Sequence, residues 1–311
     1  MRSSASPTSA SCEPGREPRR IPRMTNPAER LVDLLDLEQI EVNIFRGLSP
    51  QESLQRVFGG QVAGQALVAA ARTTDGERPV HSLHAYFLRP GRPGVPIVYQ
   101  VERVRDGRSF TTRRVTAVQQ GRTIFNLTAS FHKPEEGSFE HQLPPARKVP
   151  DPESLPTVTE EIREHLGALP ERYERMARRQ PFDIRYVDRL RWTVAEAKDA
   201  EPRSAVWMRA VGPLGDDPVV HTCALTYASD MTLLDAVRIP VEPLWGPRSF
   251  DIASLDHAMW FHRPFRADEW FLYDQESPIA TGGRGLARGR IYDTEGRLLV
   301  SVVQEGLFRA L

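Results

Sequence analysis

One segment of this 311-residue chain reads Val57-Phe58-Gly59-Gly60-Gln61-Val62-Ala63-Gly64-Gln65-Ala66-Leu67-Val68-Ala69-Ala70. Its side chains are small on nearly every face of a helix, and a helix needs that composition when a β-sheet wraps closely around it. We therefore expect a buried central helix here. The segments on either side should supply the sheet.

Strand-like segments follow this helix. They are rich in β-branched and aromatic residues and are divided by turn residues, among them Asp106-Gly107, which is typical of a tight hairpin, and Gln120-Gly121. Before the helix, apolar spacing predicts a short helix over 30–37 and a strand over 40–45. The four strands expected after the helix cover residues 80–88, 95–104, 108–119 and 122–132.

The pattern changes after residue 132 and later restarts. Residues 133–183 are rich in proline and charge, with a polar helix expected near 160–178, and are typical of a connector. Beyond them the sequence predicts a helix over 218–237 and strands over 184–192, 206–211, 255–263, 269–275, 284–292 and 298–308.

The two halves of the chain resemble each other, which indicates a duplicated helix-and-sheet unit. Their alignment sets Ala129 opposite Gln304, so one copy carries an amide where the other carries a methyl group. Three anchors align at offsets of 175, 174 and 169 residues: Gly121-Arg122 with Gly296-Arg297, Arg89-Pro90 with Arg263-Pro264, and 58–61 with 227–230.

Composition excludes several classes of function. Forty-one basic and 41 acidic residues cancel, so no overall field attracts nucleic acid or an anionic membrane. The two cysteines, Cys12 and Cys223, rule out a disulfide scaffold and fit a reducing compartment. No apolar run reaches the roughly 20 residues of a membrane span. We expect a cytoplasmic protein with no nucleic-acid or membrane partner.

The first 23 residues are rich in Ser, Pro and Arg and lack the apolar segment of a signal peptide. They contain too few large apolar side chains to offset the entropy of ordering, so a disordered tail is expected over 1–23. Met24 is a candidate start of the protein.

Five motifs together resemble the type II acyl-CoA thioesterases, the TesB-like family. The resemblance implies an α+β chain of two fused hotdog domains, each a long central helix wrapped by an antiparallel sheet. It also implies hydrolysis of fatty acyl-CoA to free acid and CoA, with no cofactor and no metal. In family order the motifs are the 57–66 segment quoted above, His84-Ala85-Tyr86-Phe87-Leu88-Arg89-Pro90-Gly91, Tyr227-Ala228-Ser229-Asp230, Leu255-Asp256-His257-Ala258-Met259-Trp260-Phe261-His262-Arg263 and Val303-Gln304-Glu305-Gly306.

On this resemblance the domains are residues 24–135, a non-catalytic copy, and 184–311, which carries the catalytic residues. Residues 136–183 form the linker between them. Since hotdog sheets commonly pair, a homo-oligomer is expected, either a dimer or a tetramer of such chains.

The resemblance implies that Asp230, Ser254 and Gln304 together hold a water molecule. The family often has Thr at the middle position, so Ser254 keeps the hydroxyl but loses the methyl that restricts χ1. A thioester is already an activated acyl group, so a positioned water can attack it directly if a carboxylate accepts the proton. Gln304 offers a donor and an acceptor, and Ser254 offers a rotatable hydroxyl. The Asp230 carboxyl is weakly basic unless its surroundings raise its pKa.

The N-terminal copy lacks these groups. Gln61 stands for Asp230, Val80 for Ser254 and Ala129 for Gln304, so no second active site is expected there. Gly59, Gly60 and Gln61 are candidates for substrate contact, with helix packing as the competing interpretation. Arginines at strand ends are candidates for binding the CoA phosphates: Arg89, Arg105, Arg108, Arg263, Arg284 and Arg288.

Other interpretations stay open at this stage. Asp230 could cap a helical turn, Ser254 could be a strand-edge hydroxyl and Gln304 a solvent-facing strand residue. The chain could also be a hotdog enoyl-CoA hydratase, suggested by Gly215-Asp216-Asp217-Pro218-Val219-Val220-His221, or a non-catalytic acyl-CoA binding module.

Two apparent clusters in the sequence are weak. Ser254, Asp256 and His257 resemble a compressed nucleophile triad, but strand alternation would turn His257 away from the other two, so a core or interface role is expected for it. His81 and His84 would likewise face opposite sides of a strand and make a poor metal pair.

Overall fold

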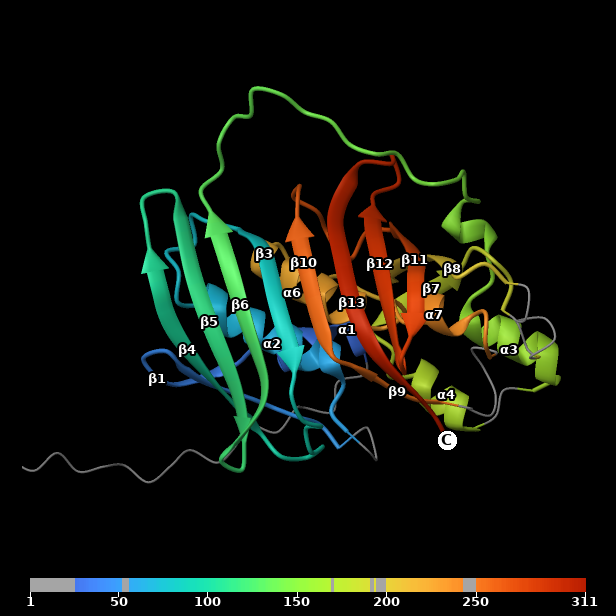
Figure 1. The fold of residues 1–311 in the computed structure, drawn as a ribbon, viewed down its shortest axis with the longest axis horizontal. Helices are drawn as coiled ribbons and strands as arrows, with labels where there is room; N and C mark the ends of the chain where they lie inside the picture. Colours follow the sequence, from blue (N-terminus) through green and yellow to red (C-terminus); the bar gives the residue numbers. More distant parts are fainter. Residues whose placement is uncertain (1–25, 52–55, 169–170, 191–192, 194–199, 243–249) are drawn as a thin grey trace, which may run out of the picture.

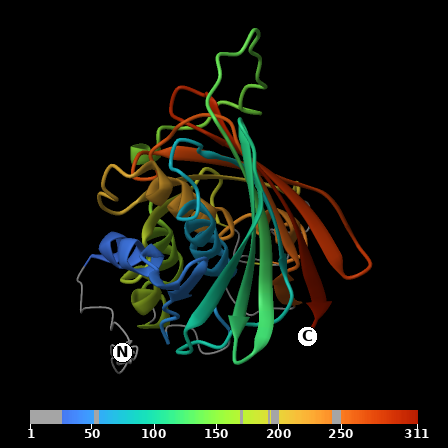
Figure 2. The same cartoon turned by 90° about the vertical axis from the view of Figure 1, so that its left-hand side faces the viewer.

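The computed structural model describes residues 26–51, 56–168, 171–190, 193, 200–242 and 250–311. The tail expected over 1–23, the candidate start at Met24 and Cys12 lie outside these residues. The described chain forms a 13-stranded antiparallel sheet, and α1 (Pro27–Leu35), α2 (Gly59–Ala71) and α6 (Pro218–Ser229) lie on one face of it (Figures 1 and 2). None of the helices described is both long and apolar enough to cross a membrane.

The N-terminal half follows the expected order of elements. The central helix α2 is confirmed, and its residues from Gly60 to Ala70 are buried without exception. The remaining elements of this half are β1 (Glu38–Glu41), β2 (Ile44–Gly47), β3 (Val80–Phe87), β4 (Ile97–Asp106), β5 (Phe110–Gln119) and β6 (Arg122–His132).

The single strand expected over 40–45 is wrong, because the chain turns in the middle of it. Asn43 adopts a left-handed backbone with φ 63°, and β1 and β2 on either side pair as an antiparallel hairpin. Asparagine visits this region more readily than most residues because its short amide can bond locally. The turn therefore replaces the middle of the expected strand.

The hairpin expected at Asp106-Gly107 forms, but its turn lies two residues further along the chain. Asp106 pairs with Thr111, and the Gly107 N–H donates to the Phe110 carbonyl at 2.9 Å, so residues 108–109 form the turn between β4 and β5. The turn expected at Gln120-Gly121 is confirmed: φ is 48° and 75° there, and the flanking residues of β5 and β6 pair directly. Two consecutive positive φ angles are what a type I′ hairpin requires.

The C-terminal half differs from expectation in two helices, one added strand and the length of two strands: the strand expected over 184–192 ends at Tyr186, and the strand expected over 269–275 continues to Thr281. Its elements are η1 (Pro152–Ser154), α3 (Val158–Leu166), α4 (Glu171–Ala177), β7 (Phe182–Tyr186), β8 (Arg203–Ala210), α6, α7 (Asp235–Arg238), β9 (Phe250–Ser254), β10 (Asp256–Phe261), β11 (Phe271–Thr281), β12 (Arg284–Tyr292) and β13 (Leu298–Ala310).

The helix expected over 160–178 is two helices, because Gly167 ends α3 in a left-handed conformation with φ 71°. The helix expected over 218–237 is interrupted, since α6 ends at Ser229 and Asp230 caps it, before α7 begins. The short strand β9 lies ahead of the expected strand 255–263 and pairs with the end of β13.

The register of the sheet supports the duplication. The strand order is β1-β2-β4-β5-β6-β3-β10-β13-β12-β11-β8-β7, so the order of one half mirrors the other about the β3–β10 pair. His84 pairs with Thr128 in one half, and Ala258 pairs with Val303 in the other. These pairs are related by the offsets of 174 and 175 residues found in the sequence.

The small residues of α2 are needed chiefly because α2 packs against α6. A Cβ added to Gly60 would lie 2.3 Å from the Tyr227 carbonyl oxygen, and one added to Gly64 would lie 3.0 Å from that of Cys223. Backbone of one helix thus touches backbone of the other, which only glycine permits. From the sequence we expected these small side chains to make room for a wrapping sheet alone. The structure shows that they also make room for α6.

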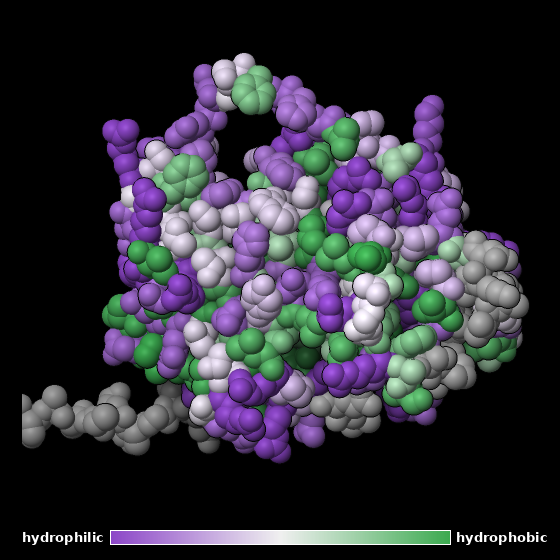
Figure 3. All heavy atoms as spheres, viewed as in Figure 1, coloured by the Kyte–Doolittle hydropathy of each residue, from purple (hydrophilic) through white to green (hydrophobic). Residues whose placement is uncertain are grey.

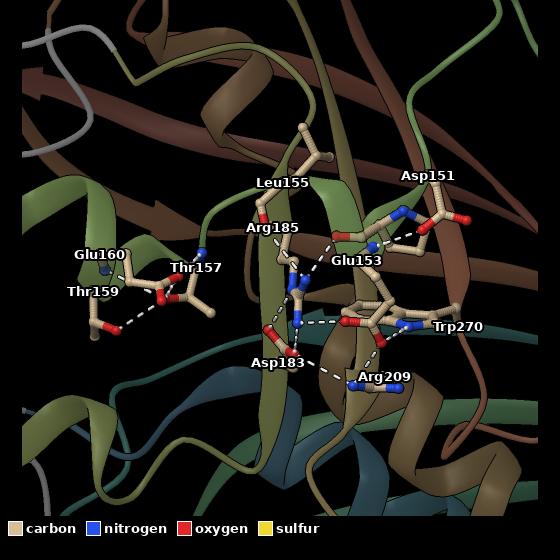
Figure 4. A network of polar contacts seen from close by, with 11 residues as sticks. Asp151, Glu153, Leu155, Thr157, Thr159, Glu160, Asp183, Arg185, Arg209 and Trp270 are labelled. Atoms are coloured by element: carbon tan, nitrogen blue, oxygen red, sulfur yellow. Dashed lines mark hydrogen bonds and ion pairs between the residues drawn. The ribbon is translucent and has the colours of Figure 1, made fainter.

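The connector is held to the C-terminal half by a clamp made of Glu153, Arg185, Arg209 and Trp270 (Figure 4). The Trp270 indole nitrogen donates to Glu153 Oε1 at 3.1 Å, and both arginines pair with the Glu153 carboxylate at 3.0 Å. The two guanidinium groups also lie 5.0 and 4.3 Å from the centre of the Trp270 ring, within cation–π range. The Glu153 clamp fixes the path by which the connector enters β7.

Candidate active site

Asp230 occupies the point where α6 ends and the chain turns towards α7. The Ser254 hydroxyl donates to its Oδ1 at 3.0 Å, and the Gln304 amide nitrogen donates to the same oxygen at 2.7 Å. The three residues come from α6, β9 and β13, and they meet because β9 pairs with the end of β13, with Ser254 opposite Gly306. The three residues chosen from the sequence therefore converge on one carboxylate.

The N-terminal half completes this cluster. The Gly60 backbone N–H also donates to the Asp230 carboxylate, and a Cβ on Gly59 would lie 2.6 Å from Asp230 Oδ2. The first turn of α2 thus points at the carboxylate, where the partial positive charge of a helix N-terminus favours an anion. These two glycines therefore serve both the site and helix packing: Gly59 lies against Asp230 in the site, and Gly60 packs against Tyr227 of α6.

Burial raises the pKa of the Asp230 carboxyl above its ordinary value. The His257 side chain and the hydrogen bonds from Gln304, Ser254 and Gly60 oppose this rise, because each favours the ionised form, but they do not cancel it. A carboxylate with a raised pKa is a stronger base than an exposed aspartate. Burial therefore gives Asp230 the raised pKa that a general base at this position needs.

A cavity of about 570 Å³ opens beside Asp230 and Ser254 and is lined by both halves of the chain. Figure 3 shows hydrophobic residues around a recess near the lower ends of β3 and β13 in that view. Three arginines also line the cavity: Arg56, Arg89 and Arg238. Its apolar walls include Val57, Val62, Phe87, Ile124 and Phe125 from one half and Met231, Leu234, Ile252, Ala253 and Leu255 from the other.

Gln304 approaches Asp230 from the core side and has no exposed surface. It is not part of the cavity wall, whereas Asp230 and Ser254 are. The solvent-facing interpretation of Gln304 is therefore wrong. The Asp230 capping interpretation is partly right, since Asp230 is the C-cap of α6, but its carboxylate serves the cluster instead of a helix N-terminus.

Of the six arginines chosen for the CoA phosphates, Arg89 alone lines the cavity. Its guanidinium donates to the Thr123 carbonyl at 2.7 Å, which holds it at the rim. Sequence reasoning missed Arg56 and Arg238, because neither lies at the end of an expected strand. The other five lie elsewhere: Arg105 and Arg108 at the β4–β5 loop, Arg263 against the Leu298 carbonyl, Arg284 on Glu305 and Arg288 on Glu276.

The counterparts in the N-terminal half do not form a second cluster. Gln61 donates to the Leu48 carbonyl at 3.0 Å, and Ala129 is fully buried opposite Arg113. The Arg113 guanidinium is satisfied by Thr73, Asp106 and backbone carbonyls. That half therefore uses a buried cation to anchor the end of α2 to the sheet.

The compressed triad does not exist. The Ser254 hydroxyl bonds Asp230, the Asp256 carboxylate accepts the Glu305 N–H at 2.7 Å, and His257 Nε2 lies 2.8 Å from Ser229 Oγ. His257 is buried in the core, as expected, but it adjoins the site, which strand alternation alone did not show.

The histidines suggested as a metal pair are separate. His81 bonds the Ser130 hydroxyl at 2.8 Å, and the His84 ring packs on Trp260. Within the described ranges, no group of three or more His, Cys, Asp or Glu side chains is placed to hold a metal ion.

Family models of known proteins match both halves of the chain. Residues 49–132 match the acyl-CoA thioesterase N-terminal domain, and residues 177–307 match the acyl-CoA thioesterase family. The chain is 41% identical to human acyl-coenzyme A thioesterase 8, over 89% of its own length and 88% of that protein. It is 39% identical to acyl-CoA thioesterase 2 of Haemophilus influenzae, over 92% and 99% of the two chains.

Solved structures agree with this assignment. An acyl-CoA thioesterase II from Mycobacterium marinum superposes with a TM-score of 0.74 at 46% identity, covering 90% of this chain and 98% of that one. A hotdog-fold protein from Alicyclobacillus acidocaldarius, 20% identical, superposes with a TM-score of 0.72 over 91% of this chain and 98% of that one and supports the hotdog fold. The chain belongs to the type II, TesB-like acyl-CoA thioesterases and is an acyl-CoA thioester hydrolase.

Proposed function

We propose that the chain hydrolyses fatty acyl-CoA with a water molecule held at the Asp230–Ser254–Gln304 cluster. Asp230 and Ser254 hold the water from the cavity wall, and Gln304 fixes the Asp230 carboxylate from behind. The observation that carries this proposal is the pair of hydrogen bonds, 3.0 and 2.7 Å long, by which Ser254 and Gln304 orient one carboxylate beside the cavity.

The reaction needs no covalent enzyme intermediate. The water oxygen bonds to the thioester carbonyl carbon while Asp230 takes its proton. The tetrahedral intermediate then collapses, the carbon–sulfur bond breaks, and the CoA thiolate leaves and is protonated. The raised pKa of Asp230 supports its role as base, and the N-terminus of α2 lies where it would stabilise developing negative charge.

The walls of the cavity support a fatty acyl substrate. Val62, Phe87, Met231 and Leu234 would contact the acyl chain, while Arg56 and Arg89 would attract the anionic CoA moiety. Both halves would then bind one substrate, although the catalytic groups come from the C-terminal half.

The arrangement of the whole chain follows from the same proposal. It would be a tandem double hotdog with domains at 24–135 and 184–311 joined by a linker at 136–183, which the mirrored strand order supports. A homo-oligomer and a cytoplasmic location belong to this proposal too. The cysteine usage supports the latter.

Thiol release from a panel of acyl-CoAs of different chain length tests the proposal. We expect turnover by the wild-type protein and a loss of at least about 100-fold in kcat for Asp230→Ala, since it removes the general base. Wild-type turnover by Asp230→Ala would contradict the mechanism while leaving the activity itself intact.

No feature of the site favours the other two candidate functions. The segment that suggested a hydratase is structural: Asp217 caps α6, and His221 bonds the Gly215 carbonyl at 2.9 Å and the Ala267 N–H at 3.1 Å. Loss of enoyl absorbance without thiol release would favour a hydratase. Tight binding without turnover would favour a binding module.

A further inference from the structure

Two buried polar atoms beside the cluster have no hydrogen-bond partner: Nδ1 of His257 and Oε1 of Gln304. The His257 side chain is 1% exposed and that of Gln304 is 0% exposed. The other end of each side chain is held, since His257 Nε2 lies 2.8 Å from Ser229 Oγ and Gln304 Nε2 lies 2.7 Å from Asp230. An orphan donor or acceptor in the core is costly, so two of them side by side call for an explanation.

The two atoms belong to neighbouring side chains. Ala258 of β10 pairs with Val303 of β13, so His257 and Gln304 are the next residues in the same antiparallel register. Neighbours of this kind lie about 5 Å apart at Cβ. The Gln304 side chain is also among the groups whose proximity favours the protonated imidazole.

We propose that His257 is a positioning residue of the active site, which as its Nδ1–H tautomer donates to Gln304 Oε1 and so keeps the amide nitrogen directed at Asp230. The proposal rests on the function proposed above. In this arrangement the Ser229 hydroxyl rotates to give its one proton to His257 Nε2 at 2.8 Å and gives up its alternative acceptor, the Thr226 carbonyl at 2.9 Å. One chain of donors then runs from Ser229 through His257 and Gln304 to the Asp230 carboxylate.

The opposite tautomer would let Ser229 keep its bond to the Thr226 carbonyl, but it would leave Gln304 Oε1 without a donor. With the proton on Nε2, the Nδ1 lone pair and the Gln304 carbonyl would face each other as two acceptors. The charged and titratable groups around His257 are Asp230, Asp256 and Tyr273, whose hydroxyl donates to the Ser229 carbonyl at 3.1 Å. Burial is the largest influence on the imidazole and lowers its pKa, so a neutral ring is available for the Nδ1–H form.

The orientation of the Gln304 amide decides whether it helps or harms the base. The two ends of a carboxamide have nearly the same shape, so sterics alone hold neither orientation. If the group turned over, its oxygen would face the Asp230 carboxylate and repel it. Losing the His257 donor should therefore lower kcat and leave KM nearly unchanged, because no substrate contact is lost.

Two polar replacements separate this role from a structural one. In His257→Asn the side-chain amide nitrogen can occupy the position of Nδ1 and donate to Gln304. In His257→Gln the amide reaches the position of Nε2, so the contact with Ser229 remains and the donor to Gln304 is lost. A matched control is Met259→Leu, a volume-conserving change on the same strand and the same buried face.

Steady-state thiol release with saturating acyl-CoA measures the outcome. We expect His257→Gln to lose about 10- to 100-fold in kcat, as removal of a supporting hydrogen bond typically does, with KM within about threefold. His257→Asn should retain kcat within about threefold of wild type, and Met259→Leu should match wild type. The double variant His257→Gln/Gln304→Ala should be no worse than Gln304→Ala alone, because His257 acts through Gln304.

Equal kcat values for His257→Asn and His257→Gln would overturn the proposal, as would additive losses in the double variant. If Gln304→Ala itself keeps wild-type activity, the function proposed for the cluster fails. If Gln304→Ala is impaired while His257→Gln is not, the cluster stands and the role of His257 alone is refuted.

Discussion

At the scale of single residues, the pKa of Asp230 links catalysis to stability. Burial raises this pKa in the folded protein, so the ionised form that catalysis needs is the form that folding disfavours. Relative to a neutral side chain, wild-type stability is highest below the pKa of an unfolded aspartate. It falls as pH rises through the folded value, by about 1.4 kcal/mol for each unit of difference between the two.

We therefore expect Asp230→Asn to lose at least about 100-fold in kcat without losing stability at neutral pH. The gain in Tm over wild type should be greater at pH 7 than at pH 4, where wild-type Asp230 is nearer its protonated form. Thermal unfolding at the two pH values, together with thiol release, checks this. A Tm for Asp230→Asn well below that of wild type at pH 7 would show that Asp230 stabilises the fold.

Gly59 is the second residue at which a substitution should lower catalysis. A Cβ there would lie 2.6 Å from Asp230 Oδ2 and 2.8 Å from the Phe87 ring, so Gly59→Ala must displace the carboxylate or close part of the cavity. We expect kcat/KM to fall about 10- to 100-fold, since shifts near 1 Å at a reacting group cost this much.

The matched control for Gly59 is Gly137→Ala, where the nearest atom to the new Cβ is 3.5 Å away and φ is ordinary. It should not change thiol release. Equal activity of Gly59→Ala and Gly137→Ala would show that the approach of α2 to Asp230 does not matter for turnover.

At the scale of elements, strand periodicity predicted most of the sheet. Both ends of β12 (Arg284–Tyr292) and of β6 (Arg122–His132) lie at the residues expected. It missed the end of α6 because Met231, Leu233 and Leu234 all favour helix, so tertiary packing alone stops the helix at Asp230. It missed β9 because its five residues show no strong alternation.

The sequence predicted the three side chains of the candidate site, but it did not predict the groups that packing brings next to them. Asp230, Ser254 and Gln304 converge as the sequence suggested, but the Gly60 N–H and the proximity of His257 depend on how α2 and β10 pack. No local pattern carries that information. For the same reason five of the six arginines lie away from the cavity.

The Glu153 clamp makes a prediction about the connector. Trp270→Ala removes both cation–π contacts and the indole donor to Glu153, and we expect a loss of about 1–3 kcal/mol in the free energy of unfolding. Trypsin should also cleave faster near Arg147 and Lys148. Trp270→Phe keeps a ring for the guanidinium groups and should fall between Trp270→Ala and wild type. No change in either measurement for Trp270→Ala would mean that the clamp does not hold the connector.

At the scale of the whole molecule, the two halves share one sheet and the larger of two hydrophobic clusters found in the described residues. The β3–β10 pair joins them, α2 packs on α6, and a single cluster of buried apolar residues spans both. We expect one cooperative transition in urea, with coincident curves from tryptophan fluorescence and circular dichroism. Two separated transitions would show that the halves are independently stable.

The asymmetry between the halves is the central claim. One half supplies Asp230, Ser254 and Gln304, while the other supplies α2 and cavity walls and has only Gln61, Val80 and Ala129 at the matching places. A chain of this kind should have one active site.

The most direct test is the kcat of Gln304→Ala measured by thiol release at saturating acyl-CoA, with circular dichroism to confirm folding. The variant removes the amide whose counterpart in the N-terminal half is Ala129. The structure predicts a loss of about 100-fold, because the Asp230 carboxylate loses a charge-assisted hydrogen bond that orients it. A folded Gln304→Ala protein that turns over within threefold of wild type would contradict the claim.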